Sequence, residues 1–168
     1  MTNNFSITAY MKNMKGITLI ELLVTLAVLA VLVAIGVPRM QGISQNNRLT
    51  AAINSLSSDM AFARSEAVNR NTSIRIRSVN GAGDWSGGWV VETADGVTTL
   101  RNSPALVANV LLNGVGAADS VTFRSDGTQT GAAVSFLSCK NGEAGNYGRQ
   151  IFVSTTGRIS LRDKQTCT

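Results

Sequence analysis

The sequence predicts an α+β protein in which one long N-terminal helix packs on an antiparallel β-sheet. Two patterns carry this expectation. Apolar residues follow helical spacing up to about residue 71, and short β-rich runs separated by glycine follow. A chain of 168 residues suits one globular domain together with a membrane segment.

The first element is a predicted transmembrane helix over residues 17–38. Its run from Ile17 to Val37 is apolar apart from one glutamate and, at about 1.5 Å per residue, is long enough to cross a hydrocarbon core of about 30 Å. Lys12 and Lys15 precede it without an acidic residue. The positive-inside rule therefore places the N-terminus in the cytoplasm and the rest of the chain across the membrane.

The second element is an amphipathic helix over residues 39–71. Its apolar residues recur three or four positions apart, as expected for one buried face. They are Leu49, Ala52, Ile53, Leu56, Met60, Ala63 and Ala67.

The remainder, residues 72–168, is predicted to form the sheet that covers this face. Its β-rich runs are Ile74–Val79, Trp89–Glu92, Thr98–Arg101, Val121–Arg124, Val134–Leu137, Ile151–Ser154 and Ile159–Leu161. Turn-forming pairs such as Asn80-Gly81 and Asp126-Gly127 separate them. Of the two tryptophans, Trp89 begins an apolar strand and is expected in the core, whereas Trp85 is the better candidate for a surface contact.

Composition argues against an enzyme. The chain has no histidine and two cysteines, which removes the commonest general base and leaves too few ligands for a zinc site. A hydrolase is the weakest hypothesis, since no pair of acids is clustered in the sequence. We expect no catalytic residue, no metal, no cofactor and no small-molecule substrate.

Glu21 is the exception within the apolar run. A carboxylate near the centre of a membrane helix costs about 2.5 to 3.5 kcal/mol, and less near an end. No lysine or arginine lies between Ile17 and Val37. The partner of Glu21 is therefore either an α-amino group or another chain, unless the carboxylate simply lies at the membrane surface.

The segment from Lys15 to Leu23, KGITLIELL, resembles the class III leader of type IV pilins and pseudopilins. The resemblance implies cleavage by a prepilin peptidase between Gly16 and Ile17, a leader of residues 1–16, and methylation of the new N-terminus at Ile17. It also implies a role for Glu21 in subunit assembly and a helix break at Pro38. Translation from Met11 instead of Met1 would give a leader of conventional length, and Met14 is a further possible start.

Three later motifs resemble the GspH/FimT family: WSGGWVV from Trp85, FRSDG from Phe123 and IFVSTTGRI from Ile151. The resemblance implies a type IV pilin-like fold in the bacterial inner membrane, with the domain in the periplasm. It also implies a minor pilin or type II secretion pseudopilin that initiates, primes or tips a filament, with other minor and major subunits as partners. The sequence leaves the choice between pilus and secretion system open.

Cys139 and Cys167 fall in the part predicted to be extracytoplasmic, where disulfides persist, and we expect them to be bonded. A second feature there is basic. If Ile159 and Leu161 face inward, then Arg158, Arg162 and Lys164 face outward. Some FimT proteins bind DNA through a Gly-Arg-x-Arg element, and this chain has Gly157-Arg158-Ile159-Ser160. A DNA receptor is therefore the alternative function, beside a merely solvated edge strand.

Overall fold

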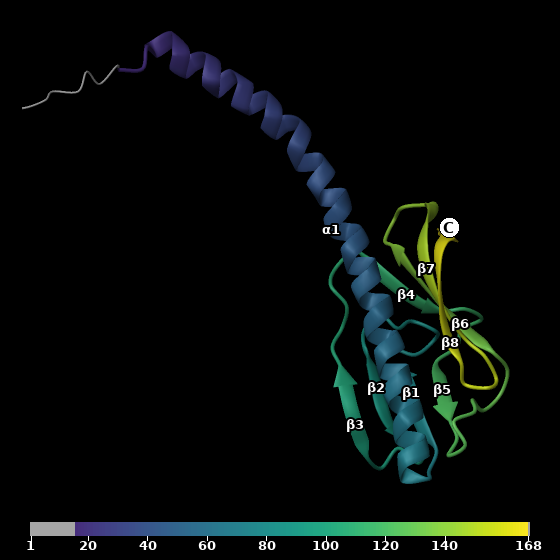
Figure 1. Ribbon diagram of the computed structural model, residues 1–168. Coiled ribbons are helices and arrows are strands. Elements are labelled where there is room, and N and C mark those ends of the chain that lie inside the picture. Colours follow the sequence, from purple (N-terminus) through teal and green to yellow (C-terminus); the bar gives the residue numbers. More distant parts are fainter. Residues whose placement is uncertain (1–15, 168) are drawn as a thin grey trace, which may run out of the picture. The chain divides into compact units, whose positions relative to one another are not determined.

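The computed structural model describes residues 16–167 (Figure 1), with side chains described outside residues 37–43. The chain divides into two compact units, Met1–Gln41 and Gly42–Thr168, which we describe separately. The expectations for residues 1–15, including the leader, Lys12, Lys15 and the start codon, lie outside the described residues.

Helix α1 (Leu19–Arg70) has a defined start and end. Thr18 precedes it, and the Thr18 hydroxyl accepts a hydrogen bond from the Glu21 backbone N–H at 3.3 Å, as an N-cap residue does. At the other end, Asn71 has a φ of 50° and the Thr72 N–H donates to the Ala67 carbonyl at 3.2 Å. This is the hydrogen bond of a Schellman C-cap.

Pro38 does not end the helix. The helical assignment covers Leu19–Arg70 without an interruption, so the expected helix break and the separation into two helices at residue 38 are not seen. A proline removes one backbone donor from a helix, and the helical assignment continues through this position.

In the first unit, α1 is apolar on every side. All side chains from Ile17 to Gly36 are exposed, and residues Leu19–Gly36 are long and apolar enough to cross a membrane. A helix that is hydrophobic all round needs an apolar environment outside itself. The predicted transmembrane element therefore has the helical structure and the exposure that such a role requires.

In the second unit, α1 has one buried face. The predicted residues Leu49, Ala52, Ile53, Leu56, Met60, Ala63 and Ala67 are all at most 5% exposed, and the prediction of an amphipathic helix is confirmed. Figure 1 shows this part of α1 lying against β1 and β2.

The predicted α+β fold, a long helix packed on antiparallel β-structure, is confirmed, and the strands form two sheets. In the first sheet the order is β3-β2-β1-β5, with strands β1 (Ile74–Ser78), β2 (Trp89–Thr93), β3 (Thr99–Ser103) and β5 (Ser120–Phe123). In the second the order is β4-β6-β7-β8, with β4 (Val110–Gly114), β6 (Val134–Lys140), β7 (Gly145–Val153) and β8 (Ile159–Cys167).

Strand β4 has no counterpart among the predicted strands. Its sequence VLLNG ends in Asn113-Gly114, a pair that is typical of turns, and its leucines do not distinguish a strand from a helix. In the structure it pairs with β6, placing Leu112 opposite Ser138. A pairing between residues this far apart in sequence is a tertiary contact that local propensity does not encode.

Both sheets share one core with α1. Ile74, Ile76 and Val91 from the first sheet and Phe136 and Ile151 from the second belong to the same buried cluster as Leu56 and Met60. Burial alternates along β1, as expected for a strand with one face inward.

Trp89 is in the core as predicted, at 1% exposure, but the interpretation of Trp85 as a surface anchor is wrong, because Trp85 is fully buried. Its indole N–H donates to the Ala118 carbonyl at 2.8 Å, and its ring packs edge-on against Phe136 with 4.8 Å between centroids. The indole thus satisfies its one polar atom inside the domain, which removes the reason for it to face solvent.

Candidate functional site

The predicted cleavage and methylation residues lie just before α1. Gly16 and Ile17 are outside the helix and exposed. A peptide bond in such a segment can enter a protease active site without unwinding a helix, because its backbone groups are not bound in helical hydrogen bonds.

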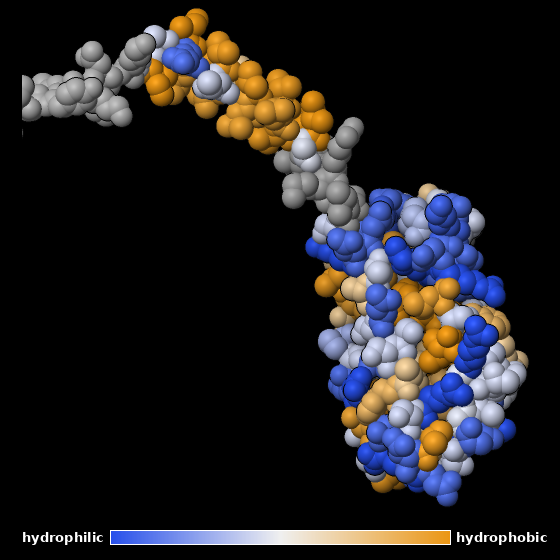
Figure 2. Space-filling view, in the orientation of Figure 1, coloured by the Kyte–Doolittle hydropathy of each residue, from blue (hydrophilic) through white to orange (hydrophobic). Residues whose placement is uncertain are grey.

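Glu21 lies in the first turn of α1 and is exposed. Figure 2 shows that the surface of this part of the helix is mostly hydrophobic. Its backbone N–H is used by the cap at Thr18, and negative charge is favourable at a helix N-terminus. Thr18 and Glu21 have the spacing of a capping box, a local pattern that the sequence interpretation did not use. Within residues 16–36 no cationic side chain faces the Glu21 carboxylate.

In the domain, Asp59 forms a buried polar cluster that sequence reasoning missed. Its carboxylate accepts hydrogen bonds from Trp89 Nε1 at 2.8 Å and from Ser103 Oγ at 2.6 Å, and it pairs with Arg101 at 2.5 Å. Burial alone raises the pKa of Asp59, but the hydrogen bonds from Ser103, Arg101 and Trp89 outweigh it and the pKa lies below its ordinary value. The cluster fastens α1 to β2 and β3.

Arg64 brings two of the sequence motifs together. Its Nε donates to the Gly127 carbonyl at 2.8 Å, in the turn of the FRSDG motif, and its guanidinium reaches the Thr156 carbonyl at 3.4 Å, in the turn of the IFVSTTGRI motif. Gly127 and Gly157 both have positive φ, and a Cβ on Gly157 would lie 2.1 Å from the Gly127 oxygen. The glycines of these motifs therefore allow two turns to meet on one arginine of the helix.

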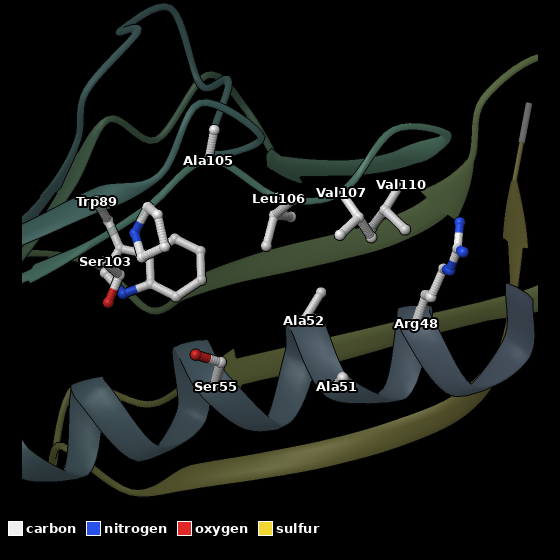
Figure 3. Close-up of a pocket in the computed structure, with 11 residues that line it drawn as sticks. Arg48, Ala51, Ala52, Ser55, Trp89, Ser103, Ala105, Leu106, Val107 and Val110 are labelled. Atoms are coloured by element: carbon white, nitrogen blue, oxygen red, sulfur yellow. The ribbon is translucent and has the colours of Figure 1, made fainter. Parts of the chain in front are cut away.

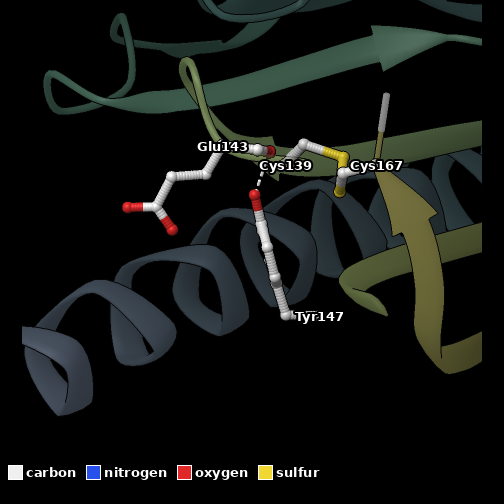
Figure 4. Close-up of a disulfide and its surroundings, with 4 residues drawn as sticks. All are labelled: Cys139, Glu143, Tyr147 and Cys167. Atoms are coloured by element: carbon white, nitrogen blue, oxygen red, sulfur yellow. Dashed lines mark hydrogen bonds between the residues drawn. A yellow bond between two sulfur atoms is a disulfide. The ribbon is translucent and has the colours of Figure 1, made fainter. Parts of the chain in front are cut away.

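The two cysteines form the predicted disulfide, which links β6 to β8 across β7 (Figure 4). Strands separated by a third strand lie about 9.5 Å apart, yet the two Cα atoms are 5.9 Å apart. At this end β7 pairs irregularly with β8, and a Cβ on Gly148 would lie 2.8 Å from Cys167 Sγ. A glycine in β7 thus leaves room for the bridge.

The three basic residues predicted to form a stripe, Arg158 directly before β8 and Arg162 and Lys164 within it, do not form one. Arg158 and Arg162 line a hollow with Phe152, whereas Lys164 has a φ of 57° and lines a different hollow with Arg149 and Asp163. Leu161 pairs with the buried Ile151, as the expected inward direction requires, yet it is 51% exposed because β8 lies at the edge of its sheet. The pairing register with β7 shifts beyond Arg162, which ends the simple alternation before Lys164.

An apolar groove of about 330 Å³ lies between α1 and the segment Ser103–Val110 (Figure 3). Of the residues that line it, Arg48 alone is charged, and the Ser103 hydroxyl is bound to Asp59. The carboxylate of Asp59 beside Ser103 is already paired with Arg101 and accepts a hydrogen bond from Trp89 Nε1. In the described part of the chain, no group of three or more His, Cys, Asp or Glu side chains could hold a metal ion.

Solved structures with the same architecture are filament subunits. The type IV minor pilin FimU of Pseudomonas aeruginosa PAO1 is 27% identical, with a TM-score of 0.66 over 75% of this chain and 97% of FimU. A second crystal form of FimU gives a TM-score of 0.62. The minor pseudopilin EpsH of the Vibrio cholerae type 2 secretion system shares the fold, with 14% identity and a TM-score of 0.55 over 69% of this chain and 97% of EpsH.

Family models match both parts of the chain, although no curated protein matches it. The prokaryotic N-terminal methylation motif covers residues 11–37. The model described as type II transport protein GspH covers residues 52–157, which include both turns held by Arg64. Together with the fold, this match shows that the chain belongs to the GspH family, as a structural subunit of the minor pilin and pseudopilin type.

Proposed function

We propose that this subunit, once processed by a prepilin peptidase, initiates, primes or tips a type IV pilus or type II secretion pseudopilus. The observation that carries the proposal is the joining of an apolar helix, exposed on every side, to a domain with the FimU fold. Such a helix can be buried in a membrane and then against the helices of neighbouring subunits, because both environments are apolar.

Processing is proposed at the bond between Gly16 and Ile17, followed by methylation of Ile17. The methylation motif covers this bond and begins at Met11, where the shorter leader would start. Intact-mass analysis of the protein from cells that contain the peptidase should show loss of everything through Gly16 and one added methyl group. A chain that enters filaments with its leader attached would contradict this step.

Glu21 is proposed to pair with the α-amino group of a neighbouring subunit. The Thr18 cap uses only the backbone N–H of Glu21, so the carboxylate remains available for this contact. An ion pair is worth more in an apolar environment than in water, where each charge is solvated. The amino group created by cleavage supplies the opposite charge that residues 16–36 lack.

Glu21→Gln is the decisive variant, because it keeps the side-chain shape and removes the charge. It should insert into the membrane at least as well as the wild type, yet enter filaments poorly. Thr18→Ala is the matched control: it removes the cap and leaves the carboxylate, so it should lower helix stability by about 1 kcal/mol and preserve incorporation. Normal incorporation of Glu21→Gln would remove Glu21 from the assembly site.

The domain is proposed to be periplasmic, with the N-terminus in the cytoplasm. The disulfide between Cys139 and Cys167 supports this orientation, since disulfides persist in oxidising compartments. Protease added to spheroplasts should digest the domain. Protection of the domain in intact spheroplasts would reverse the assignment.

The alternative of a DNA receptor is not favoured by a specific observation. Arg158 and Arg162 lie apart from Lys164, so the three cations do not provide the continuous track that a phosphate backbone follows. We therefore retain the assembly role as the proposed function.

A further inference from the structure

We propose that the free edge of β8 binds an extended acidic segment of another protein by adding it as a further strand. β8 is the last strand of its sheet, and β7 is its one strand partner in the described part of the chain. The outer edge of such a strand carries backbone N–H and C=O groups that a neighbouring sheet strand does not occupy. An extended peptide can bind to these groups along the edge.

The outer face of this edge is suited to carboxylates. The register places Phe152 opposite Ser160 and Gln150 opposite Arg162, so Arg162 shares a face with Phe152. The Arg162 guanidinium lies 5.3 Å from the centroid of the Phe152 ring. Stacking on an aromatic ring orients a guanidinium and leaves its N–H groups free to bind a carboxylate through two hydrogen bonds.

Arg158 adds a second cation to the same hollow. Neither Arg158 nor Arg162 forms an ion pair with any side chain that the structure describes, and no acidic residue lines this hollow. Arg158 directly precedes β8 and Arg162 lies within it, and both side chains line this one hollow. Carboxylates on alternate residues of an added strand would therefore meet them.

The opposite face of the edge is apolar. Leu161 is opposite Ile151, which is fully buried, yet at the sheet edge Leu161 is 51% exposed and also borders the hollow of the two arginines. A strand added at this edge would cover Leu161 with its own inward side chain. The ligand that fits both faces is a segment in which acidic and apolar residues alternate.

Two other occupants fit less well. A second copy of this chain would bring two β8 edges together and place like charges opposite each other, which is destabilising. A nucleic acid would leave Leu161 uncovered and would find Lys164 separated from the arginines by the irregularity in β8. The same irregularity limits strand addition to about the first half of β8. The inference does not depend on where the subunit lies in a filament.

Anisotropy titrations of the full chain in detergent micelles test the proposal, with a labelled peptide of alternating Glu and Val as the probe. Three competitors are needed: the same peptide with Gln for Glu, the same peptide with alternate backbone amides methylated, and a single-stranded oligonucleotide of equal charge. We expect binding of the acidic peptide alone, since only it offers both carboxylates and a free strand edge.

The double variant Arg158→Gln/Arg162→Gln should weaken binding of the acidic peptide by about tenfold or more, the loss expected when charge-assisted hydrogen bonds are removed. Leu161→Ser should weaken it by a smaller factor. Arg124→Gln, which removes an exposed arginine in another turn, is the matched control and should not change it.

Several results would overturn the proposal. Equal binding of the methylated peptide would show charge attraction without strand addition, and equal competition by the oligonucleotide would indicate a phosphate site. If the acidic peptide does not bind even at low salt, the charges of β8 serve to keep the edge unpaired. Equal affinity of the double variant and the wild type would place the binding elsewhere.

Discussion

The two parts of α1 use the same aliphatic residues in opposite ways. Between Ile17 and Gly36 every side chain is exposed, whereas between Leu49 and Ala67 the apolar residues at helical spacing are buried by the domain's own sheets. The difference shows where each part obtains its hydrophobic stabilisation. The second part folds against its own chain, and the first must be covered by lipid or by other subunits.

Truncating one leucine in each part tests this contrast most strongly. Leu56 is fully buried, so Leu56→Ala should lower the free energy of unfolding of the domain by about 3 to 5 kcal/mol. Leu26 is 53% exposed, and Leu26→Ala should change the free energy of unfolding of the domain by less than about 0.5 kcal/mol. Denaturation in detergent, followed by fluorescence of the buried Trp85 and Trp89, measures both. Equal losses would contradict the assignment of separate environments.

Removal of the disulfide should have the next largest effect, and only on the domain. Cys139 and Cys167 are 28 residues apart, and closing a loop of this length contributes about 3 to 4 kcal/mol in the chain-entropy model. Replacing both cysteines with serine should lower domain stability by that amount and abolish its sensitivity to reductant. Circular dichroism should show unchanged helicity in the apolar part of α1.

Gly148→Ala tests the space that the bridge needs. A Cβ there would lie 2.7 Å from the Gln165 carbonyl oxygen, and overpacking of this kind costs about 1 to 3 kcal/mol. We expect slower or incomplete disulfide formation, measured by titration of free thiols. Gly142→Ala, at a site open to solvent, controls for the loss of a glycine. Because Gly142 has a positive φ, the Gly142→Ala variant should also lose some stability, but its two cysteines should still form the disulfide.

The smallest effect concerns acid stability of the contact between α1 and β3. The Asp59 pKa is lower in the folded domain than its ordinary value. The ionised carboxylate therefore stabilises the folded domain fully at pH values above the unfolded pKa, about 3.9. This stabilisation is lost as the pH falls through the folded pKa. Asp59→Asn should cost about 1 to 2 kcal/mol at neutral pH and flatten the loss of stability below about pH 4. An acid limb as steep in Asp59→Asn as in the wild type would contradict this role of Asp59.

Local patterns predicted much of the helix. The seven apolar residues of the buried face were identified by spacing alone because a helix repeats every 3.6 residues, and the end near Asn71 follows from the change of period after it. Thr18 could also have been recognised as the cap, since it precedes Glu21 by the three residues that a capping box requires.

Long-range contacts were not predictable in the same way. The separation into two sheets depends on which strands pair, and β4 and β8 acquire their partners only in the folded domain. Arg64 resembles any other arginine of an amphipathic helix in the sequence, and its role arises because two distant turns present their carbonyls to it. Trp85 was misjudged because the acceptor of its N–H, Ala118, lies 33 residues away.

The sequence by itself determined the apolar helix, the buried face of its second half, the family resemblance and the pairing of the two cysteines. These follow from residue type, period and compartment, which are local or compositional properties. The tertiary structure alone decided that Asp59 and Arg64 connect the helix to the sheets and that an arginine-lined strand edge is left free. It also placed Arg158 and Arg162 in one hollow and Lys164 in another. The physical reason is that partners distant in the chain, such as Arg64 and Gly127, meet only when the whole domain has packed.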